Sequence, residues 1–197
     1  MILDTVTICN RLREKDYASP NNKLELLRQK GEYIQVRHGL YETDRNTPPH
    51  LLACAIYGPS YLSFEYALSF YGLIPEKVVA FTSATMRKNR TKQFINDFGT
   101  YTYRDIPAAA FPHETVIKDY DGRGYQIATA EKAVCDMLYI QEPVYSLKAL
   151  KELLFDNMRL DEDVFHKLDK AALIFLCPLY GRKNLNFLYK MISKEIK

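Results

Sequence analysis

Cationic and titratable side chains gather near the start of the chain, and their chemistry suits the binding of phosphate groups. Long cationic side chains close to a helix start are typical phosphate ligands, and an asparagine amide pairs well with the edge of adenine. From composition alone, these residues can equally be the solvent-facing side of an amphipathic helix. A DNA-binding interpretation therefore requires them to lie together on one accessible ridge. The candidate residues are Asn21, Asn22, Lys23, Arg28, Lys30, Arg37 and His38.

A second basic run lies in "TMRKNRTKQF", which contains no acidic residue. It follows an expected strand and is predicted to form a loop. One interpretation is a second electrostatic contact, to nucleic acid or to an acidic partner such as a toxin or its RNA substrate. The other is a solvated connection, and the sequence leaves both open. The cations of this run are Arg87, Lys88, Arg90 and Lys92.

Glu131, Lys132 and Asp136 are the residues closest in type to a metal-dependent nuclease site. Such a site needs carboxylates that converge on a divalent ion, usually from a strand. Here the residues fall in a predicted helix, where the adjacent side chains of Glu131 and Lys132 diverge by about 100°. A carboxylate in the first turn and an i,i+4 ion pair explain the pattern without catalysis.

The remaining reactive side chains are scattered. The histidines belong to no recognisable serine or cysteine motif, "DGRGYQ" lacks the pattern of a phosphate loop, and the cysteine spacing fits no zinc site. We therefore expect no catalytic residues, no metal, no cofactor and no enzymatic activity. These residues are His38, His50, His113 and His166, with Cys9, Cys54, Cys135 and Cys177.

Size and charge set limits on the architecture. The 197 residues have room for a small domain attached to a larger one. A net charge of +3 is weak, so any DNA binding has to come from local clustering of cations. The sequence shows no signal peptide and no stretch as long as a membrane span. We expect a cytoplasmic protein.

The first 45 residues are predicted to form a unit of two helices and a hairpin. A first helix is expected over 2–14, with Ile2 and Val6 on its apolar stripe. A second begins at Ser19 and Pro20, a capping hydroxyl followed by proline, and ends near Lys30 and Gly31. Leu24 and Leu27, then Ile34 and Val36, should face the core. Gly39 permits the turn of the hairpin, and "DRNTPP" reads as a linker.

Residues 46–197 are predicted to form an α+β domain with a mixed sheet. Helices are expected over 49–58 and over 60–72, the latter capped by Ser60. Strands are expected over 78–83 and 100–106, and a hairpin over 115–129 with Asp121-Gly122 at its turn. Thr129 caps a helix to Tyr139, and the rest of the chain is mostly helical.

The order of these segments resembles the AbiEi-type antitoxins, which are predicted transcriptional regulators of viral-defence systems. The resemblance covers roughly residues 17–140 and rests on "KLELLRQKGEYIQVRHGLYET", "PSYLSFEYALSFYGLIPE", "FTSATMRKNRTKQF", "GTYTYRDIP" and "IATAEKAVCDMLYI". It implies an N-terminal winged helix that binds operator DNA and a C-terminal domain with antitoxin activity against a nucleotidyltransferase-like toxin. Within it, Pro20 to Lys30 resembles the recognition helix, and Arg37-His38-Gly39 resembles the wing. A complete winged helix has three helices before the wing, whereas this chain has space for about two.

The resemblance favours an antitoxin-like regulator of transcription that binds operator DNA. The alternative is a protein-interaction module that touches no DNA and docks a partner through a tyrosine-rich helix and the second basic run. That helix carries more large rings than one face can bury, and exposed aromatic rings are favoured at interfaces. Its rings are Tyr61, Phe64, Tyr66, Phe70 and Tyr71.

Overall fold

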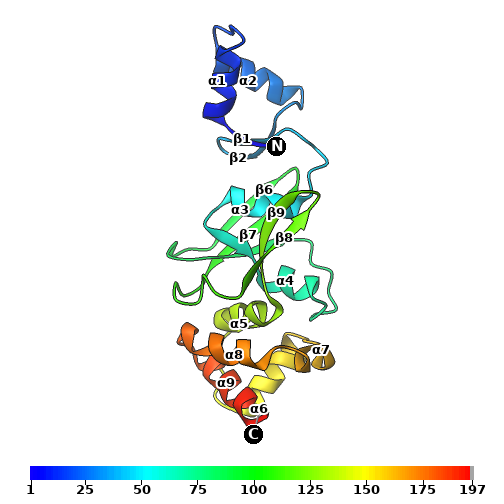
Figure 1. Cartoon of the computed structure of the whole chain (residues 1–197), viewed down its shortest axis with the longest axis vertical. Coiled ribbons are helices and arrows are strands. Elements are labelled where there is room, and N and C mark those ends of the chain that lie inside the picture. Colours follow the sequence, from blue (N-terminus) through cyan, green and yellow to red (C-terminus); the bar gives the residue numbers. More distant parts are fainter. Residues whose placement is uncertain (196–197) are drawn as a thin grey trace.

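The computed structural model describes residues 1–195 as an elongated molecule with three tiers (Figure 1). A small unit of two helices and three short strands occupies one end, a larger sheet lies in the middle, and the C-terminal helices form the other end. We call residues 1–45 the N-terminal unit and residues 46–195 the larger unit.

The N-terminal unit is a three-stranded antiparallel sheet covered by two helices. The strand order is β1-β3-β2, so β2 lies at an edge. Its small core consists of Leu3, Ile8, Leu12, Leu24, Leu27 and Tyr41, with Tyr33 packed against it. The elements are β1 (Ile2–Asp4), α1 (Thr5–Arg13), α2 (Pro20–Gln29), β2 (Ile34–Arg37) and β3 (Leu40–Glu42).

The expected helix over 2–14 is wrong at its start, because the first residues pair as a strand. Leu3 lies opposite Tyr41 of β3. Asp4 then caps α1 by accepting a hydrogen bond from the Thr7 amide at 2.7 Å. The apolar stripe shifts as a result: Val6 is 66% exposed, whereas Ile8 is buried.

Helix α2 forms where the sequence predicts it. Pro20 occupies the first turn and Leu24 and Leu27 are buried. Gly31 has a φ of +76°, the left-handed conformation that ends the helix. Ser19 stands at the capping position, but its side chain makes no capping bond.

The larger sheet is mixed, as the sequence predicts. Its strand order is β6-β7-β5-β4-β9-β8. β5 runs parallel to β7 and β4 runs parallel to β9, whereas the other neighbours are antiparallel. Asp121 and Gly122 form the turn of the predicted hairpin, with φ of 52° and 72°. The strands are β4 (Ser60–Leu62), β5 (Phe81–Thr85), β6 (Lys92–Asn96), β7 (Gly99–Asp105), β8 (Thr115–Tyr120) and β9 (Arg123–Ala128).

Three predicted boundaries in this unit are wrong. The segment "SYL" is strand β4 rather than the start of a helix, and helix α4 (Phe64–Phe70) begins only after Ser63. β4 pairs on both sides in the sheet interior, with β5 and β9, and this pairing overrides the helical periodicity of its rings. The strand expected over 78–83 is displaced to β5. The second basic run is a loop only as far as Thr91, because β6 begins at Lys92.

Helices α5 to α9 lie at the end of the larger unit away from the N-terminal unit, whereas α3 lies at the end of the sheet nearest to it (Figure 1). Thr129 caps α5 by accepting a hydrogen bond from the Lys132 amide at 3.2 Å, as the sequence predicts. Among the described residues, no helix is both long enough and apolar enough to cross a bilayer. The helical elements are a 3-10 helix (Pro49–Leu52), α3 (Ala53–Ile56), α5 (Ala130–Ile140), α6 (Leu147–Lys151), a π-helical segment (Glu152–Asn157), α7 (Glu162–His166), α8 (Lys170–Leu176), a second 3-10 helix (Cys177–Tyr180) and α9 (Lys183–Glu195).

Specific contacts fix the N-terminal unit on the larger unit. The register of β2 shifts between Gln35 and Arg37, and Val36 between them is buried in the core of the larger unit. Asn96 of β6 donates to the Val36 carbonyl at 2.8 Å. On another side, Arg123 lies 3.4 Å from the carboxylate of Glu42, which is completely buried. The hairpin is therefore anchored rather than free.

Candidate nucleic-acid interface

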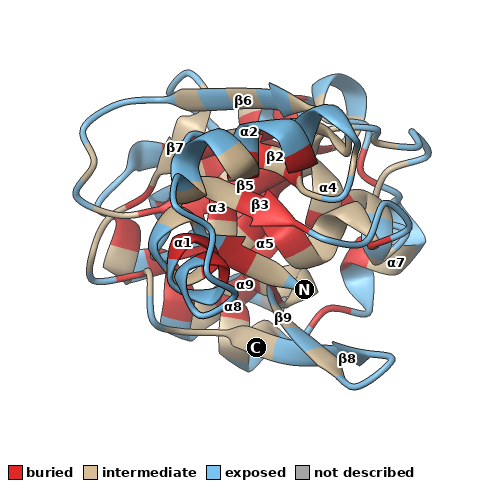
Figure 2. Cartoon of the chain, turned by 90° about the horizontal axis from the view of Figure 1, so that it is seen from above, coloured by how far each residue is buried: buried red, intermediate tan, exposed pale blue. Residues whose placement is uncertain are grey.

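The face of α2 that points away from the core carries two amides, a carboxylate and an aliphatic side chain. Leu24 and Leu27 define the buried side, so the helical repeat places Asn22 and Gln29 on the opposite side, with Glu25 and Leu26 at its two edges. Leu26 is 52% exposed although it is a large apolar residue. Viewed from above, α2 lies at the outer surface of the molecule with its polar side exposed (Figure 2).

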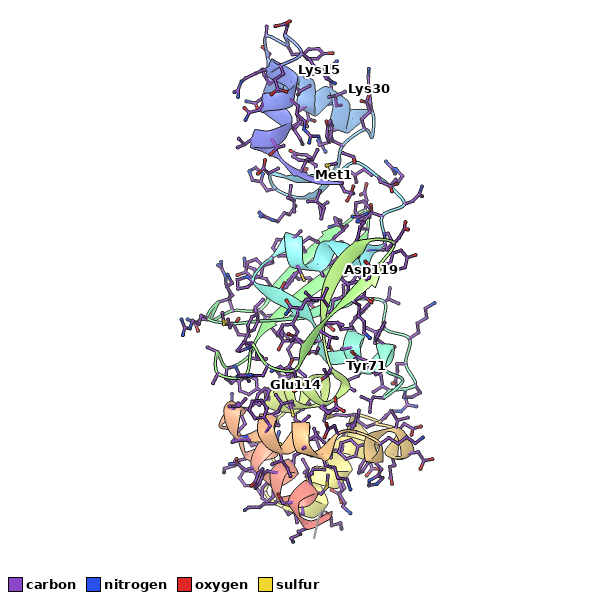
Figure 3. The ribbon with its side chains drawn as sticks, viewed as in Figure 1. Met1, Lys15, Lys30, Tyr71, Glu114 and Asp119 are labelled. Carbon is purple, nitrogen blue, oxygen red and sulfur yellow. The ribbon has the colours of Figure 1, made fainter. Side chains whose placement is uncertain are left out.

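The cations of α2 lie on its two flanks instead of on one ridge. Lys23 and Lys30 are seven residues apart and share one flank, whereas Arg28 lies about 140–160° away around the helix. The Lys23 ammonium sits 4.6 Å from the centre of the Tyr17 ring. Lys30 is the C-cap residue of the helix and is exposed at the side of the unit (Figure 3). The expectation of a single ridge is wrong in this respect.

Arg28 is already engaged by an acidic neighbour. Its Nε and Nη2 donate to the two carboxylate oxygens of Glu25, at 2.9 and 2.6 Å. The hydrogen bond from Arg28 holds the pKa of Glu25 below its ordinary value. Both side chains are exposed, so solvent screens the pair and it adds little to the stability of the fold. A phosphate would compete with Glu25 for Arg28.

The two predicted base-contacting asparagines have different environments. Asn22 is exposed on the outer face of α2. Asn21 lies on the Arg28 flank, and its Oδ1 accepts a hydrogen bond from the Cys9 thiol of α1 at 3.1 Å. Asn21 is therefore turned toward α1. Gln29, which sequence reasoning missed, shares the outer face with Asn22, and the seven-residue spacing between them was the signal.

The hairpin tip presents Arg37 and His38, both exposed. Gly39 has a φ of +75° and closes the turn. Its carbonyl accepts a hydrogen bond from the Thr5 amide at 3.1 Å, which ties the tip to the start of α1. Arg37, His38 and Arg28 line one groove at the junction with the larger unit.

The second basic run is held in a defined shape by Asp105 of β7. The Asp105 carboxylate accepts hydrogen bonds from the amides of Lys88 and Asn89, each at 2.6 Å, and from the Thr85 hydroxyl at 2.5 Å. Arg87 and Asn89 adopt left-handed conformations, with φ of 56° and 53°. Such conformations persist only where the surroundings enforce them. Arg87 and Arg90 are exposed, whereas Lys88 sits 5.1 Å from the centre of the Tyr57 ring.

Lys132 and Asp136 form the predicted i,i+4 ion pair at 3.2 Å, but both side chains are completely buried. Lys132 donates to the Ala110 carbonyl and the Tyr180 hydroxyl, each at 2.7 Å. The Asp136 carboxylate accepts from Tyr180 at 2.5 Å, from Ser63 at 2.7 Å and from Tyr61 at 3.0 Å. Every polar group in this cluster has a partner, and none of these side chains reaches the surface. The cluster is structural.

Burial shifts the ionisation of this cluster. Desolvation lowers the pKa of Lys132, an effect that the neighbouring Asp136 carboxylate opposes. Burial also raises the pKa values of Tyr61 and Tyr180 well above 10, and the negative charge of Asp136 adds to the effect. The sequence signal for this burial was present: α5 reads "AEKAVCDMLYI", which is apolar on most of its circumference.

Within residues 1–195, no group of three or more histidine, cysteine, aspartate or glutamate side chains is placed to hold a metal ion. The predicted rings of "SYLSFEYALSFYG" divide between core and surface. Tyr61 and Phe64 are fully buried, whereas Phe70 is 47% exposed and packs edge-on against Tyr71 at a centroid distance of 5.0 Å.

No protein-family model matches this sequence, and no curated protein matches it as a relative. The likeness to AbiEi-type antitoxins rests on the sequence segments alone and stays a prediction.

Proposed function

We propose that this chain is an antitoxin-like transcriptional regulator that binds operator DNA through its N-terminal unit. The observation that carries the proposal is the arrangement of side chains on α2, whose outer face carries two amides and has cations on both flanks. A hairpin with a basic tip lies beside this helix. The order β1-α1-α2-β2-β3 supports a reduced winged helix in which α2 acts as the recognition helix and the tip acts as the wing.

The single ridge that the sequence interpretation required is not present, so the proposal depends instead on a helix that lies in the major groove with cations on both of its flanks. The groove is bordered by two phosphate strands, so Lys23 and Lys30 would contact one strand while Arg28 and Arg37 contact the other. The outer face would then meet base edges. Amides such as those of Asn22 and Gln29 pair with adenine, and an exposed aliphatic side chain such as Leu26 contacts the thymine methyl group. The proposed operator is therefore rich in A·T pairs at the positions that α2 contacts.

A salt titration with the full chain and a fluorescent duplex from its own promoter tests this function. Four phosphate contacts predict a slope of log affinity against log salt of about −3.6, or about a 150-fold loss of affinity between about 50 and 200 mM salt. Arg37→Ala should weaken binding to every duplex and reduce the slope by about 0.9. Asn22→Ala should instead reduce the preference for the promoter over a G·C-rich duplex. A wild-type protein that does not bind, or binds with no salt dependence, would contradict the proposal.

The second half of the proposal is that the larger unit counteracts a nucleotidyltransferase-like toxin. Its support is the resemblance of "IATAEKAVCDMLYI" and the neighbouring segments to the antitoxin family. Co-expression with a toxin of this class, encoded beside the gene, should restore growth. Unrelieved growth arrest in the presence of the full chain would refute this part alone.

A second candidate function is a protein-interaction module that touches no DNA. The exposed Phe70 and the rigid basic loop of Arg87 and Arg90 favour it, because both are surface groups that partners bind. Binding of a partner through Phe70 should depend little on salt, and Phe70→Ala should abolish it while Arg37→Ala leaves it intact.

A further inference from the structure

An open groove of about 420 Å³ lies between the N-terminal unit and the end of β6. Its volume falls in the range of sites that hold small ligands or segments of larger ones. One wall comes from the N-terminal unit and includes Arg28, Arg37 and Arg45. The other wall comes from the larger unit and includes Ile95, Asn96 and Asp97. The groove therefore exists only in the assembled chain.

The charges that line this groove are mostly positive. Three arginines and one aspartate, Asp97, are among the lining residues, and Glu25 binds one of these arginines, Arg28. The side chain of Arg37 donates to the His38 carbonyl at 3.4 Å. Within the described part of the chain, neither Arg37 nor Arg45 has an ion-pair partner. Two arginines are therefore free to bind an anion.

Arg45 owes its position to the end of α2. A Cβ atom on Gly31 would lie 3.2 Å from Nη2 of Arg45, so the missing side chain leaves room for the guanidinium. The guanidinium thus lies where the carbonyl end of α2 favours a cation. Arg45 lies near the start of the segment expected to be a linker, and folding of the chain brings it into the same groove as Arg28.

A hydrogen bond ties the opposite wall to the hairpin that carries Arg37. Asn96 closes the base of the groove by donating to the Val36 carbonyl at 2.8 Å. Ile95 next to it is 75% exposed, an apolar surface suited to a sugar or a base beside a phosphate. A ligand in the groove would touch both units at once.

We propose that this groove binds phosphate groups, and that a nucleic acid strand carries them there. The inference rests on the proposed function and extends it. The strand on the Arg28 flank of α2 passes between the two units, with Arg28, Arg37 and Arg45 against its phosphates and Ile95 against its sugars. Planar guanidinium groups bind phosphate oxygens in pairs, which suits a cluster of three arginines. The larger unit then forms part of the DNA interface.

Two substitutions in the full-length chain test the groove from its two sides. Arg45→Ala removes a cation, and Ile95→Glu places a carboxylate on the larger unit without changing any residue of the N-terminal unit. With Arg45 as a fifth phosphate contact, the wild-type salt slope becomes about −4.5, and Arg45→Ala should return it to about −3.6. At about 0.1 M salt each contact contributes about eightfold through counterion release, so this variant should weaken binding of the promoter duplex by about that factor. Ile95→Glu should weaken binding at least as much. Lys148→Ala, on the distant α6, removes a side chain that is 88% exposed and should change nothing.

The outcomes separate this inference from the proposed function. If Arg37→Ala and Lys23→Ala weaken DNA binding while Arg45→Ala and Ile95→Glu do not, the groove inference is overturned and the regulator proposal stands. If the wild-type chain binds no DNA, the regulator proposal and the groove inference both fail for nucleic acid. Inorganic pyrophosphate then serves as the probe of the groove. Pyrophosphate binding that disappears in Arg45→Ala would retain the phosphate site and assign it to a free phosphorylated ligand. Absence of pyrophosphate binding as well would end the proposal. Matching melting temperatures for all variants exclude misfolding as the cause.

Discussion

Replacement of Lys132 by methionine should destabilise the larger unit because it isolates a buried negative charge. Methionine has a similar length and an apolar surface, so the change leaves little cavity. Asp136 keeps its hydrogen bonds from Tyr61, Ser63 and Tyr180 but loses its cation. Removal of one partner from a buried ion pair costs about 3–5 kcal/mol. For a chain of this size, that cost lowers the melting temperature by about 6–20 °C.

A double variant separates the effect of charge from the effect of packing. The double variant Lys132→Met with Asp136→Asn removes both charges, keeps an acceptor oxygen for the hydroxyl groups, and should recover at least half of the loss.

Circular dichroism in the near ultraviolet measures this transition, because the chain has 15 tyrosines and no tryptophan. Lys148→Met serves as the control: the same residue types are exchanged at an exposed position, and the free energy of unfolding should change by less than about 0.5 kcal/mol. A Lys132→Met protein that melts within about 2 °C of the wild type would refute the reasoning. A double variant as unstable as Lys132→Met would assign the effect to packing instead of charge.

Two further predictions concern alkaline pH and the basic loop. Burial raises the pKa values of Tyr61 and Tyr180 in the folded state, so their contribution to stability is complete below pH 10 and is lost above it. Beyond about pH 10.5, where Lys132 no longer titrates in the opposite sense, these two tyrosines alone should make the free energy of unfolding fall by up to about 3 kcal/mol per pH unit in chemical denaturation. Other buried tyrosines with raised pKa values, such as Tyr103, add to the fall, and a flat profile would contradict the prediction. Asp105→Ala removes the acceptor for two loop amides, so hydrogen exchange of the Lys88 and Asn89 amides should accelerate at least about tenfold. Unchanged exchange in β7 serves as the internal control. Unchanged exchange in the loop would show that other contacts hold it.

Local signals in the sequence were sufficient for much of the fold. Pro20 and Gly31 mark the two ends of α2, and Asp121-Gly122 marks the turn between β8 and β9, because each of these residues fits a backbone conformation that few others adopt. Thr129 likewise marks the start of α5 through its capping bond. These features depend on neighbouring residues only.

Features that depend on distant partners were not predicted. β1 forms because residues 2–4 pair with residues 40–42, and β4 forms because two strands from elsewhere in the chain lie on either side of it. The burial of Lys132 likewise depends on Tyr180, which is far along the chain. The same limit applies to the candidate site. The positions on α2 follow from the helical repeat, but the place of Arg45 in a groove with Ile95 follows from the contact between two units.

The way the N-terminal unit is anchored explains how so small a unit keeps its shape. A unit of about 45 residues rarely stabilises itself through its own core, and this one has a core of only a few side chains. Two features add to that core: β1 forms a third strand of the sheet, and Val36 is inserted in the core of the larger unit. The bulge at Val36 turns that side chain toward the larger unit while Arg37 beside it stays exposed at the tip. The contact that stabilises the hairpin is therefore the same contact that positions its cation, and it also forms the base of the groove. For this reason the larger unit contributes to the shape of any surface that the N-terminal unit offers to DNA.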